Sequence, residues 1–412
     1  MLRGHRQSWF EKWRWPHEIN FLGAVVPILE SNWMQKTDVL IVGAGIAGAS
    51  LAYFLVPHSQ VTLLEWESQP GYHATGRSAA LYSETYGNAT VRAITTAAKA
   101  FYFAPPEGFS PYPLVTPRGA LIVGTADDQD ALHALLLDMQ ALVPNVQWWT
   151  QEQILQRVPV VRPEFAACGI FEPDAMDMDV DGIHQGFLRG AKAAGAKLVC
   201  DARAQAVTRE AGGWRVETPA GSFWAPVLVN AAGAWCDELA RLAGVATVGL
   251  QPKRRTAFTC EGPAGCDIGL WPMVIDAQES FYFKPDAGVL LVSPANEDPV
   301  SPQDVQPEEL DVAIAVDRVE TVTTLQIRSI NRKWAGLRTF VADKTPVVGF
   351  APDAPGFFWL AGQGGYGIQT APAMGELAAA LVRGLPVPVA LASRGVQAQD
   401  VSPTRPGLTE SA

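Results

Sequence analysis

The stretch Asp38-Val-Leu-Ile-Val-Gly-Ala-Gly-Ile-Ala-Gly48 decides the fold of this chain. After Asp38, the four residues 39–42 are apolar and favour β structure, which predicts a strand buried on both faces of a parallel sheet. Three glycines then follow in the pattern Gly-x-Gly-x-x-Gly. A helical pattern over 49–55 and a second apolar run over 61–64 complete a strand–turn–helix–strand unit. The sequence therefore predicts an α/β domain that binds a dinucleotide at this turn.

Each glycine of the turn has its own physical role. Gly43 permits the tight turn, Gly45 lets the backbone approach a pyrophosphate, and Gly48 lets the helix pack closely against the strand. The start of the helix offers free N–H groups to the anion. Glu65 ends the second strand, where it is placed to accept hydrogen bonds from the adenosine ribose.

This unit would suit NAD or FAD, and two later segments favour FAD. Residues 224–235 have the pattern of a buried strand that runs into a turn of small residues, which would bring the following chain to the same cofactor. Residues 356–370 have the pattern of another strand and a second glycine-rich turn, followed by an Ala-rich helix over 371–381. The start of that helix would stabilise the negative charge of a reduced flavin ring.

Length, charge and cysteine content narrow the class of protein. The 412 residues suffice for two or three domains with a large core. The 31 Lys and Arg against 42 Asp and Glu give a formal net charge of -11, so no overall positive field would draw the chain to nucleic acid. The cysteines indicate reduced thiols in a cytosolic protein, because they have no paired spacing. Cys260 and Cys266 have no further ligands nearby for zinc, and we expect no metal.

Residues 1–33 differ from the rest of the chain. They combine basic side chains and tryptophans with the apolar run 21–29, which contains a proline. A run this short does not span a bilayer, which takes roughly 20 residues, so we expect no transmembrane segment. A secretory signal or a peripheral membrane contact would also fit, but we favour an upstream extension before a native start at Met34. The expected location is the cytoplasm, with a peripheral position at the inner membrane as the alternative.

Several motifs spread along the chain carry a family likeness. They are Val-Gly-Ala-Gly-Ile-Ala-Gly-Ala-Ser (42–50), Gln-Pro-Gly-Tyr-His-Ala-Thr-Gly-Arg-Ser-Ala-Ala (69–80), Val-Leu-Val-Asn-Ala-Ala-Gly-Ala-Trp-Cys-Asp (227–237), Leu-Gln-Pro-Lys-Arg-Arg (250–255), Trp-Ala-Gly-Leu-Arg (334–338) and Gln-Gly-Gly-Tyr-Gly-Ile-Gln-Thr (363–370). Together they resemble the FAD-dependent D-amino-acid dehydrogenases and oxidases, which include glycine and sarcosine oxidases. Within that family they are most similar to bacterial D-arginine dehydrogenases.

The resemblance implies a Rossmann-like FAD-binding domain with an inserted substrate domain built on an antiparallel sheet. The FAD-binding domain would be discontinuous, because the substrate domain interrupts it. The expected boundaries are 34–110, 180–250 and 330–395 for the FAD-binding domain, 111–179 and 251–329 for the substrate domain, and 396–412 for a flexible tail.

The resemblance also implies that FAD is bound without a covalent link. Arg77 and the three residues after it would lie along the FAD, and the backbone near Ala204 would meet the adenine. The residues expected to contact the cofactor are Gly43, Gly45, Ile46, Ala47, Gly48, Glu65, Arg77, Ser78, Ala79, Ala80, Ala204, Gly233, Trp235, Gly364, Gly365, Tyr366, Gly367, Ile368 and Gln369.

In the substrate pocket, the resemblance places Arg255, Tyr282 and Arg338 around the carboxylate of an amino acid. The chemistry suits this role, because a guanidinium grips a carboxylate bidentately and a tyrosine hydroxyl adds a neutral donor. The resemblance also places Tyr86 on a mobile lid and the Gly365 carbonyl near the substrate amine. The remaining residues expected in the pocket are Leu81, Ser83, Ala120 and Met273.

Two departures from the family pattern bear on the substrate. This chain has Leu81 where the D-arginine dehydrogenases have a lid histidine, and Ala120 where they have the glutamate that holds the substrate guanidinium. A cationic substrate side chain in this pocket would lose its hydration shell without gaining a carboxylate partner, which costs on the order of several kcal/mol. We therefore predict a preference for neutral side chains, with Glu84 as the one feature that would restore cation binding.

The expected reaction is the oxidative deamination of a D-amino acid. Hydride transfer to flavin N5 would yield an imino acid, and water would hydrolyse it to a 2-oxo acid and ammonia. The electron acceptor stays open between O2, a quinone and another carrier. One alternative is a glycine, sarcosine or secondary-amine oxidase of the same superfamily. The other is a non-catalytic FAD-bound subunit, against which the presence of Arg255, Tyr282 and Arg338 argues.

An acidic cluster stands apart from these motifs. It surrounds two methionines at residues 174–181. Calcium binding is one interpretation, but we favour a solvated loop that leads to a helix N-cap. The four acidic residues are Asp174, Asp177, Asp179 and Asp181.

Overall fold

The strand–turn–helix–strand unit expected near the start of the domain is present. The computed structural model describes residues 34–408, and in it β2 (Val39–Val42), α1 (Ile46–Leu55) and β3 (Val61–Leu64) follow one another. The two strands pair in parallel, with α1 in the crossover between them. Every residue of both strands is buried, as uninterrupted apolar runs predict for a sheet covered on both faces.

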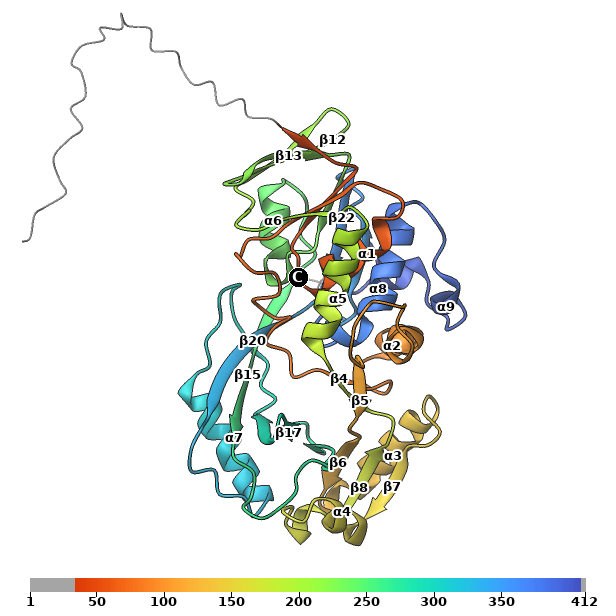
Figure 1. Cartoon of the computed structure of the whole chain (residues 1–412). Helices are drawn as coiled ribbons and strands as arrows, with labels where there is room; N and C mark the ends of the chain where they lie inside the picture. Colours follow the sequence, from red (N-terminus) through yellow and green to blue (C-terminus); the bar gives the residue numbers. More distant parts are fainter. Residues whose placement is uncertain (1–33, 409–412) are drawn as a thin grey trace, which may run out of the picture. The chain divides into compact units, whose positions relative to one another are not determined.

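A six-stranded sheet forms the centre of this part of the molecule (Figure 1). All its strands are parallel except the edge strand β21. One face packs against helices α1, α2 (Ala89–Phe103), α5 (Val180–Ala193) and α8 (Gly367–Val382), and the other against α6 (Cys236–Leu242) and a small antiparallel sheet. This confirms the expected Rossmann-like architecture. In spatial order the strands are β10 (Lys197–Val199), β3, β2, β14 (Val227–Asn230), β22 (Phe357–Ala361) and β21 (Val347–Phe350).

A second sheet has nine strands and is mainly antiparallel. Helix α7 (Glu309–Val322) packs on it through a large apolar cluster, and α3 (Gln129–Gln140) and α4 (Gln151–Arg157) pack near its far edge. β20 pairs with β15 in this sheet, although the expected boundary at 330 put its residues with the FAD-binding domain. The strands are β19 (Asp298–Pro299), β15 (Gln251–Cys260), β18 (Val289–Ser293), β17 (Tyr282–Asp286), β16 (Met273–Asp276), β6 (Ala120–Gly124), β8 (Cys168–Glu172), β7 (Gln147–Thr150) and β20 (Arg332–Phe340).

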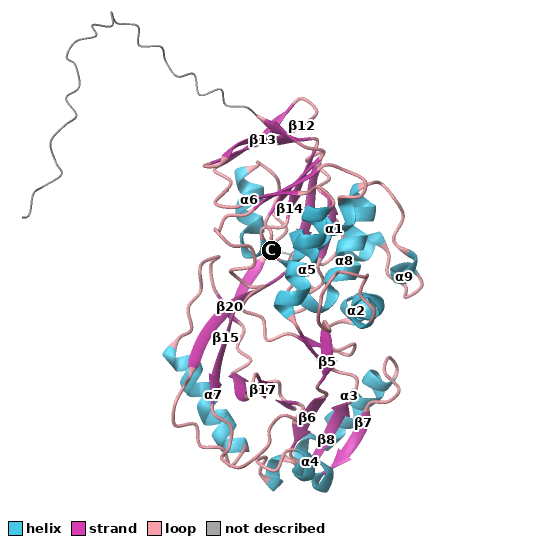
Figure 2. Cartoon of the chain, viewed as in Figure 1, coloured by secondary structure: helices cyan, strands magenta, loops and turns pink. Residues whose placement is uncertain are grey.

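Two smaller sheets and several short helices complete the described residues (Figure 2). One sheet joins β4 (Leu81–Tyr82), β9 (Met176–Met178) and β5 (Val115–Pro117); the other joins β1 (Gln35–Lys36), β13 (Gly221–Ala225), β12 (Gly213–Thr218) and β11 (Ala206–Glu210). The short helices are α9 (Val389–Ala392), η1 (Ala126–Asp128), η2 (Pro163–Phe165), η3 (Gly233–Trp235) and η4 (Ala398–Val401).

Two prolines change elements that the sequence predicted. The strand expected from Trp224 is divided at Pro226 into β13 and β14, which belong to different sheets. Helix α8 starts at Gly367 and contains Pro372 in its interior. Because Pro372 has no N–H for the Ile368 carbonyl, that carbonyl instead accepts a hydrogen bond from the buried Tyr102 hydroxyl.

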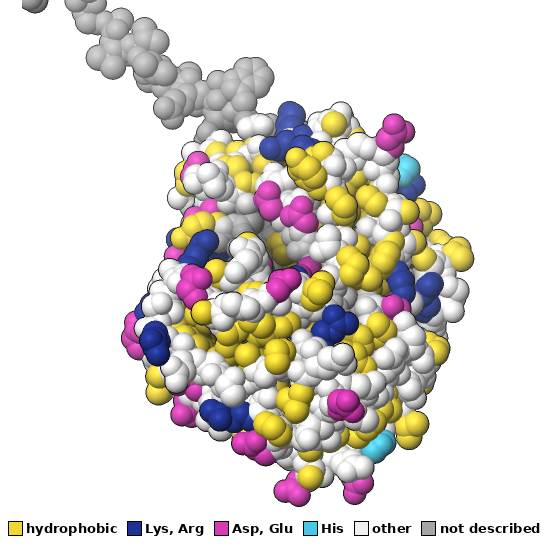
Figure 3. All heavy atoms as spheres, turned by 60° about the horizontal axis from the view of Figure 1, so that its bottom comes forward, with side chains coloured by type: hydrophobic (Ala, Val, Ile, Leu, Met, Phe, Trp, Pro, Cys, Tyr) yellow, Lys and Arg dark blue, Asp and Glu magenta, His cyan; other side chains and the backbone are white. Residues whose placement is uncertain are grey.

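Surface charge and helix length bear on nucleic-acid binding and on membrane insertion. On the face shown in Figure 3, Lys and Arg side chains are scattered among Asp and Glu and form no continuous basic surface. Among residues 34–408, no helix is both long and apolar enough to cross a bilayer. The predicted extension 1–33 lies outside the described residues.

The C-terminal segment is packed where a flexible tail was expected from residue 396. Its anchor is Arg405, whose guanidinium donates to both carboxylate oxygens of Asp343, at 2.7 and 2.9 Å, and to the carbonyls of Thr345 and Pro346. Leu408 is also buried. The composition of the segment suggested mobility, but a buried arginine with this many acceptors holds it as far as the structure describes it.

Removing this anchor should destabilise the protein. We expect Arg405→Met to lower the free energy of unfolding by about 2–4 kcal/mol, because it leaves Asp343 without its partner. Chemical denaturation measures the change. Arg394→Met, which removes an exposed arginine whose side chain donates to the Ala390 carbonyl of the preceding helix α9, should change stability little. Equal stability of the two variants would contradict the role assigned to Arg405.

Candidate active site

A cleft of about 550 Å³ opens where β2, β3 and β14 end. Its lining includes Gly43 after β2, Glu65 after β3 and Gly233 after β14. In open α/β sheets, ligands bind outside the carboxyl ends of parallel strands. The fold therefore brings together, in one cleft, three segments that the sequence assigned to one cofactor.

Two glycines of the turn at the cleft leave no room for a side chain. Gly43 has a φ of 105°, and a Cβ there would overlap the carbonyl oxygen of Ala231. A Cβ on Gly48 would overlap the carbonyl oxygen of Gly43. Gly45 precedes α1 as its N-cap and supplies no side-chain cap. The turn can therefore pack against β14 while its backbone faces the cleft.

Glu65 is held in place by backbone amides. Its two carboxylate oxygens accept hydrogen bonds from the N–H groups of Ala44 and Glu67, each at 3.0 Å. The carboxylate is buried, which raises its pKa, although both amides favour the charged form. Each oxygen retains a lone pair, so Glu65 can accept a further hydrogen bond from a ligand hydroxyl in the cleft.

Two residues that support the turn were missed by the sequence analysis. His184 on α5 lies 2.8 Å from the Ala44 carbonyl through Nε2, so this nitrogen must carry the proton. Burial lowers the pKa of His184, which keeps the ring neutral. The Thr75 hydroxyl accepts a hydrogen bond from the Ile46 N–H at 3.0 Å. No local pattern could identify either contact, because the partners are 140 and 29 positions apart.

Arg77 lies between the two sheets. It lines the cleft as predicted, and its guanidinium donates to the carbonyls of Val305 and Ala335, at 2.9 and 3.1 Å, and to Asp304. The hydrogen bond from Arg77 and its positive charge hold the pKa of Asp304 below its usual value. The Trp334 indole in turn donates to the Arg77 carbonyl at 3.0 Å. Arg77 therefore ties the segment after β3 to the nine-stranded sheet.

Aromatic side chains flank the cleft near the expected adenine position. The Arg203 guanidinium lies 3.9 Å from the ring centre of Trp66, and the Trp66 ring meets Trp235 edge to face at 5.4 Å. All three line the cleft together with Ala204. Trp66 and Arg203 were not predicted; Trp66 directly follows Glu65, but nothing near Arg203 in the sequence indicated this contact.

A second cavity, of about 110 Å³, contains the predicted carboxylate-binding residues Arg255, Tyr282 and Arg338. The pairing of β15 with β20 sets Lys253 opposite Arg338 and Arg255 opposite Gly336. Side chains alternate along a strand, so Arg255 and Arg338 lie on the same face of the sheet. Arg77 and Thr75 line both cavities, which places the second cavity next to the first.

The second cavity has a strongly positive character. Burial would raise the pKa of Tyr282, but the guanidiniums of Arg338 and Arg255 outweigh it and lower that pKa. Burial and the charge of Arg338 lower the pKa of Arg255. Burial also opposes the charge of Arg338, but Tyr86 and Tyr282 raise its pKa, and Arg338 donates to the Tyr86 hydroxyl at 3.1 Å. Two arginines that repel each other in a buried site would be stabilised by a bound anion.

The second glycine turn fits closely around these groups. A Cβ on Gly365 would lie 3.0 Å from the Arg338 guanidinium carbon, and one on Gly364 would overlap the Phe340 ring. The side-chain nitrogen of Gln363, which lines the cavity, is buried without a hydrogen-bond partner. The following helix, α8, has no side-chain N-cap. This unpaired donor and the free helix start match the electron-rich edge of a flavin ring, so the residues present fit FAD.

The structure divides the predicted cofactor residues into three groups. Those that line the first cleft are Gly43, Gly45, Glu65, Arg77, Ala204, Gly233 and Trp235. Those that line the second cavity are Ile46, Arg77, Ser78, Ala79, Gly364, Gly365, Gly367 and Ile368. Those in neither lining are Ala47, Gly48, Ala80, Tyr366 and Gln369. Among the last group, Gln369 bonds with Ser83 and Thr95, and Tyr366 packs against Tyr86.

Two of the residues expected around the substrate side chain, Leu81 and Met273, belong to an apolar wall next to Tyr282. The same cluster includes Leu291 and Trp334. None of Leu81, Ser83, Ala120 and Met273 lines the second cavity itself.

A buried carboxylate lies next to this wall. Ala120 pairs directly across the strands with Glu172, which the sequence analysis missed. The Glu172 carboxylate accepts hydrogen bonds from the hydroxyls of Ser83 and Thr85, both at 2.8 Å, and burial raises its pKa. Glu84, the residue considered for cation binding, is paired with Lys99 at 2.5 Å.

The acidic cluster serves structural contacts. Asp179 caps α5 by accepting a hydrogen bond from the Gly182 N–H at 2.9 Å, as expected for an N-cap. Asp177 is not a solvated loop residue, because it accepts from Arg118 at 2.6 Å and from Lys284 at 2.7 Å. Within residues 34–408, no three His, Cys, Asp or Glu side chains gather in a way that could hold a metal ion.

Comparison with known families and sequences gives consistent matches. A family model described as "DAO: FAD dependent oxidoreductase" matches residues 38–381. Among curated proteins, the glycine oxidase of Bacillus subtilis (strain 168) is 22% identical over 352 residues, which are 84% of this chain and 92% of the relative.

Solved structures show the same fold at similarly low identity. The L-alpha-glycerophosphate oxidase of Mycoplasma pneumoniae, with FAD bound, has a TM-score of 0.77 at 20% identity and covers 85% of this chain and 95% of its own. The iminodiacetate oxidase of Chelativorans sp. BNC1 has a TM-score of 0.76 at 22% identity and covers 89% of this chain and 99% of its own. At these identities the likeness shows the fold alone.

The neutral state of His184 should make stability depend on pH. The folded state holds the pKa of His184 below the ordinary value of 6.5, so its contribution is complete above that pH and is lost as the pH falls below it. We expect His184→Gln, which keeps an N–H donor but cannot titrate, to lose less stability than the wild type between about pH 7 and pH 5. Denaturation at both pH values measures this. An identical loss in both proteins would refute the role of His184; His133→Gln, at an exposed histidine, is the control.

Tyr282 should control the alkaline limit of anion binding. As the pH rises through its lowered pKa, the hydroxyl loses its proton, cannot donate and repels a carboxylate. We expect the affinity of the FAD-bound wild type for 4-methylpentanoate to fall as the pH rises toward 10. The affinity of Tyr282→Phe should stay constant over the same range, because the variant has no hydroxyl to titrate. At neutral pH the variant should bind about tenfold more weakly. Titration by flavin absorbance measures both; a parallel alkaline loss in the variant would contradict the assignment.

Proposed function

We propose that this chain, which belongs to the family of FAD-dependent oxidoreductases, oxidises the amine of a neutral D-amino acid to an imine that water hydrolyses to a 2-oxo acid and ammonia. The observation that carries the proposal is the convergence of Arg255, Arg338 and Tyr282 in a cavity next to the cofactor cleft, with the Tyr86 hydroxyl bonded to Arg338. A carboxylate is the anion that such a set binds best. The D configuration rests on the family likeness of the motifs.

The residues of the chain contribute binding and orientation. FAD, when bound, accepts a hydride equivalent from the substrate Cα. Arg255 and Arg338 hold the substrate carboxylate, and the hydroxyl of Tyr282 donates to it. When the carboxylate is held, the Cα–H bond can take only a small set of orientations. This restriction is the source of the rate enhancement at such a site.

The amine must be neutral when its Cα is oxidised. The positive potential of Arg255 and Arg338 disfavours an ammonium group nearby and so favours loss of its proton to water. The carbonyl of Gly365, in the turn that packs against Arg338, accepts a hydrogen bond from the amine. No side chain of the site is needed as a general base in this scheme.

The wall next to Tyr282 favours an apolar substrate side chain. Two charged groups lie on the sheet that carries Tyr282: Glu172, opposite Ala120, is already bonded to two hydroxyls, and Lys284, on the strand of Tyr282, is bonded to Asp177. Neither charge is free to pair with a substrate, while the surrounding cluster with Leu81 and Met273 is apolar. A cationic side chain would therefore be desolvated without compensation.

A second candidate is a glycine or secondary-amine oxidase. The similarity to glycine oxidases and to an iminodiacetate oxidase favours it, and a cavity of about 110 Å³ suits a small substrate. The positions of Arg255 and Arg338 serve this function equally, since glycine and its N-substituted forms carry the same carboxylate.

A substrate panel separates the candidates. We expect anaerobic D-leucine, D-methionine and D-phenylalanine to bleach the flavin at least about tenfold faster than D-arginine, because the pocket offers no free carboxylate. The rate of loss of flavin absorbance measures this. A preference for D-arginine would refute the assigned pocket, a preference for glycine or sarcosine would favour the second candidate, and no bleaching by any amine would leave a non-catalytic FAD protein.

The electron acceptor needs its own measurement. The same substrates assayed with O2, by peroxide formation, and with an artificial dye under nitrogen separate an oxidase from a dehydrogenase. Peroxide formation at the rate of flavin bleaching identifies an oxidase, whereas bleaching with dye reduction but without peroxide identifies a dehydrogenase that passes electrons to a quinone or another carrier.

A further inference from the structure

The sheet is interrupted beside Arg255. On one edge β15 pairs with β20 along its length, but on the other edge it pairs with β19 only at residues 253–254 and with β18 only at 258–260. The backbone of Thr256 therefore has no strand partner on that side. A buried amide and carbonyl without partners would be costly.

Two side chains fill this gap. Asn296 accepts a hydrogen bond from the Thr256 N–H at 2.9 Å, and the Ser293 hydroxyl donates to the Thr256 carbonyl at 2.6 Å. The Ser293 oxygen also accepts from the N–H of Ala295 at 3.2 Å, which has a φ of 52°. The segment between β18 and β19 thus leaves the sheet in a shape that these two side chains hold.

The same segment turns a carbonyl toward the site. The main-chain oxygen of Asn296 accepts a hydrogen bond from Nε of Arg255 at 2.7 Å. This leaves the outer edge of the Arg255 guanidinium for a ligand. A nearby carboxylate competes for that edge, because Glu297 lies 3.4 Å from it, but Lys253 and Lys344 also draw Glu297, at 3.1 and 3.6 Å.

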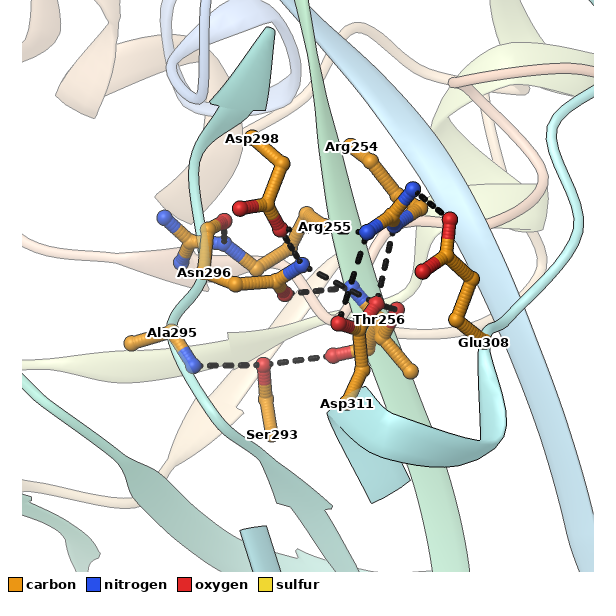
Figure 4. A network of polar contacts seen from close by, with 9 residues as sticks. All are labelled: Arg254, Arg255, Thr256, Ser293, Ala295, Asn296, Asp298, Glu308 and Asp311. Atoms are coloured by element: carbon orange, nitrogen blue, oxygen red, sulfur yellow. Dashed lines mark hydrogen bonds and ion pairs between the residues drawn. The ribbon is translucent and has the colours of Figure 1, made fainter. Parts of the chain in front are cut away.

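A partly buried polar network holds the Asn296 side chain (Figure 4). Its amide nitrogen donates to Asp298 at 2.7 Å and to Asp311 at 3.2 Å. Asp311, at the start of α7, also accepts from the Thr256 hydroxyl at 2.6 Å and from Arg254 at 2.8 Å. Because Arg254 and Asp311 are both buried, these contacts leave Asn296 little freedom.

We propose that Asn296 is a positioning residue for substrate binding, which orients Arg255 through its main-chain carbonyl and is itself held by Asp311. The inference rests on the proposed function, in which Arg255 binds the substrate carboxylate. Arginine has a long flexible side chain, and fixing Nε before the ligand arrives removes much of the entropy cost of binding. If the hydrogen bond from Nε to the Asn296 carbonyl is lost, the Arg255 guanidinium can rotate and pair more closely with Glu297.

A double-mutant cycle tests the proposal with 4-methylpentanoate as the probe and the FAD-bound protein as the sample. We expect Asn296→Ala to raise the Kd about tenfold in the wild type and by less than about twofold in an Arg255→Gln background. The Kd of 4-methylpentanamide, which has no charge, should not change. Asn331→Ala, at an exposed asparagine beside β20, is the matched control and should leave both values unchanged.

Each outcome has a distinct meaning. Equal effects of Asn296→Ala in both backgrounds, or no effect in the wild type, would overturn the positioning role while Arg255 keeps its own. An unchanged Kd in Arg255→Gln, or no binding by the wild type, would instead overturn the proposed carboxylate site and the inference with it. If Asn296→Ala does not fold, Asn296→Asp keeps the acceptor for Thr256, removes the donor to Asp311, and is judged by the same cycle.

Discussion

The antiparallel pairing of β15 with β20 is the constraint on which the candidate site depends. It joins two segments that are far apart in the sequence in a register that sets Lys253 opposite Arg338 and Arg255 opposite Gly336. Because side chains alternate along a strand, a slip of one residue would turn one of the two arginines to the opposite face. The positive cavity exists only in this register.

The same alternation gives Arg254 and Arg255 opposite roles. Arg254 points to the α7 side, where Asp298, Glu308 and Asp311 surround it. Arg255 points to the cavity, where its main protein contact is a carbonyl. The guanidinium of Arg254 is paired with three carboxylates and so connects the sheet to α7. Arg255 has fewer acceptors in the protein, and its guanidinium can therefore bind a ligand. The acidic side chains that would compete for Arg255 are thus mostly used on the other face.

The first cleft, which would hold the cofactor, depends on close approach of backbone segments rather than on strand register. Gly43 and Gly48 let α1 and β14 approach the turn without side chains between them, and His184 secures the turn from α5. Arg77 then connects this region with the nine-stranded sheet through Val305 and Ala335. The two cavities share residues because these contacts bring the sheets together.

The sequence by itself determined the Rossmann-like unit, because apolar runs and glycines are local patterns, and it favoured FAD as the cofactor. Arg255, Tyr282 and Arg338 became candidates only through the likeness of the longer motifs to a known family. The sequence did not reveal Glu172, His184, Asn296 or the anchoring of Arg405. Their roles come from hydrogen bonds and strand pairs between residues far apart in the sequence, for which no local pattern exists. The family likeness selected Arg255 rather than Arg254, but only the tertiary structure gives the physical reason, because the strand register turns the two side chains to opposite faces and the acidic partners of Arg254 lie on the face away from the cavity.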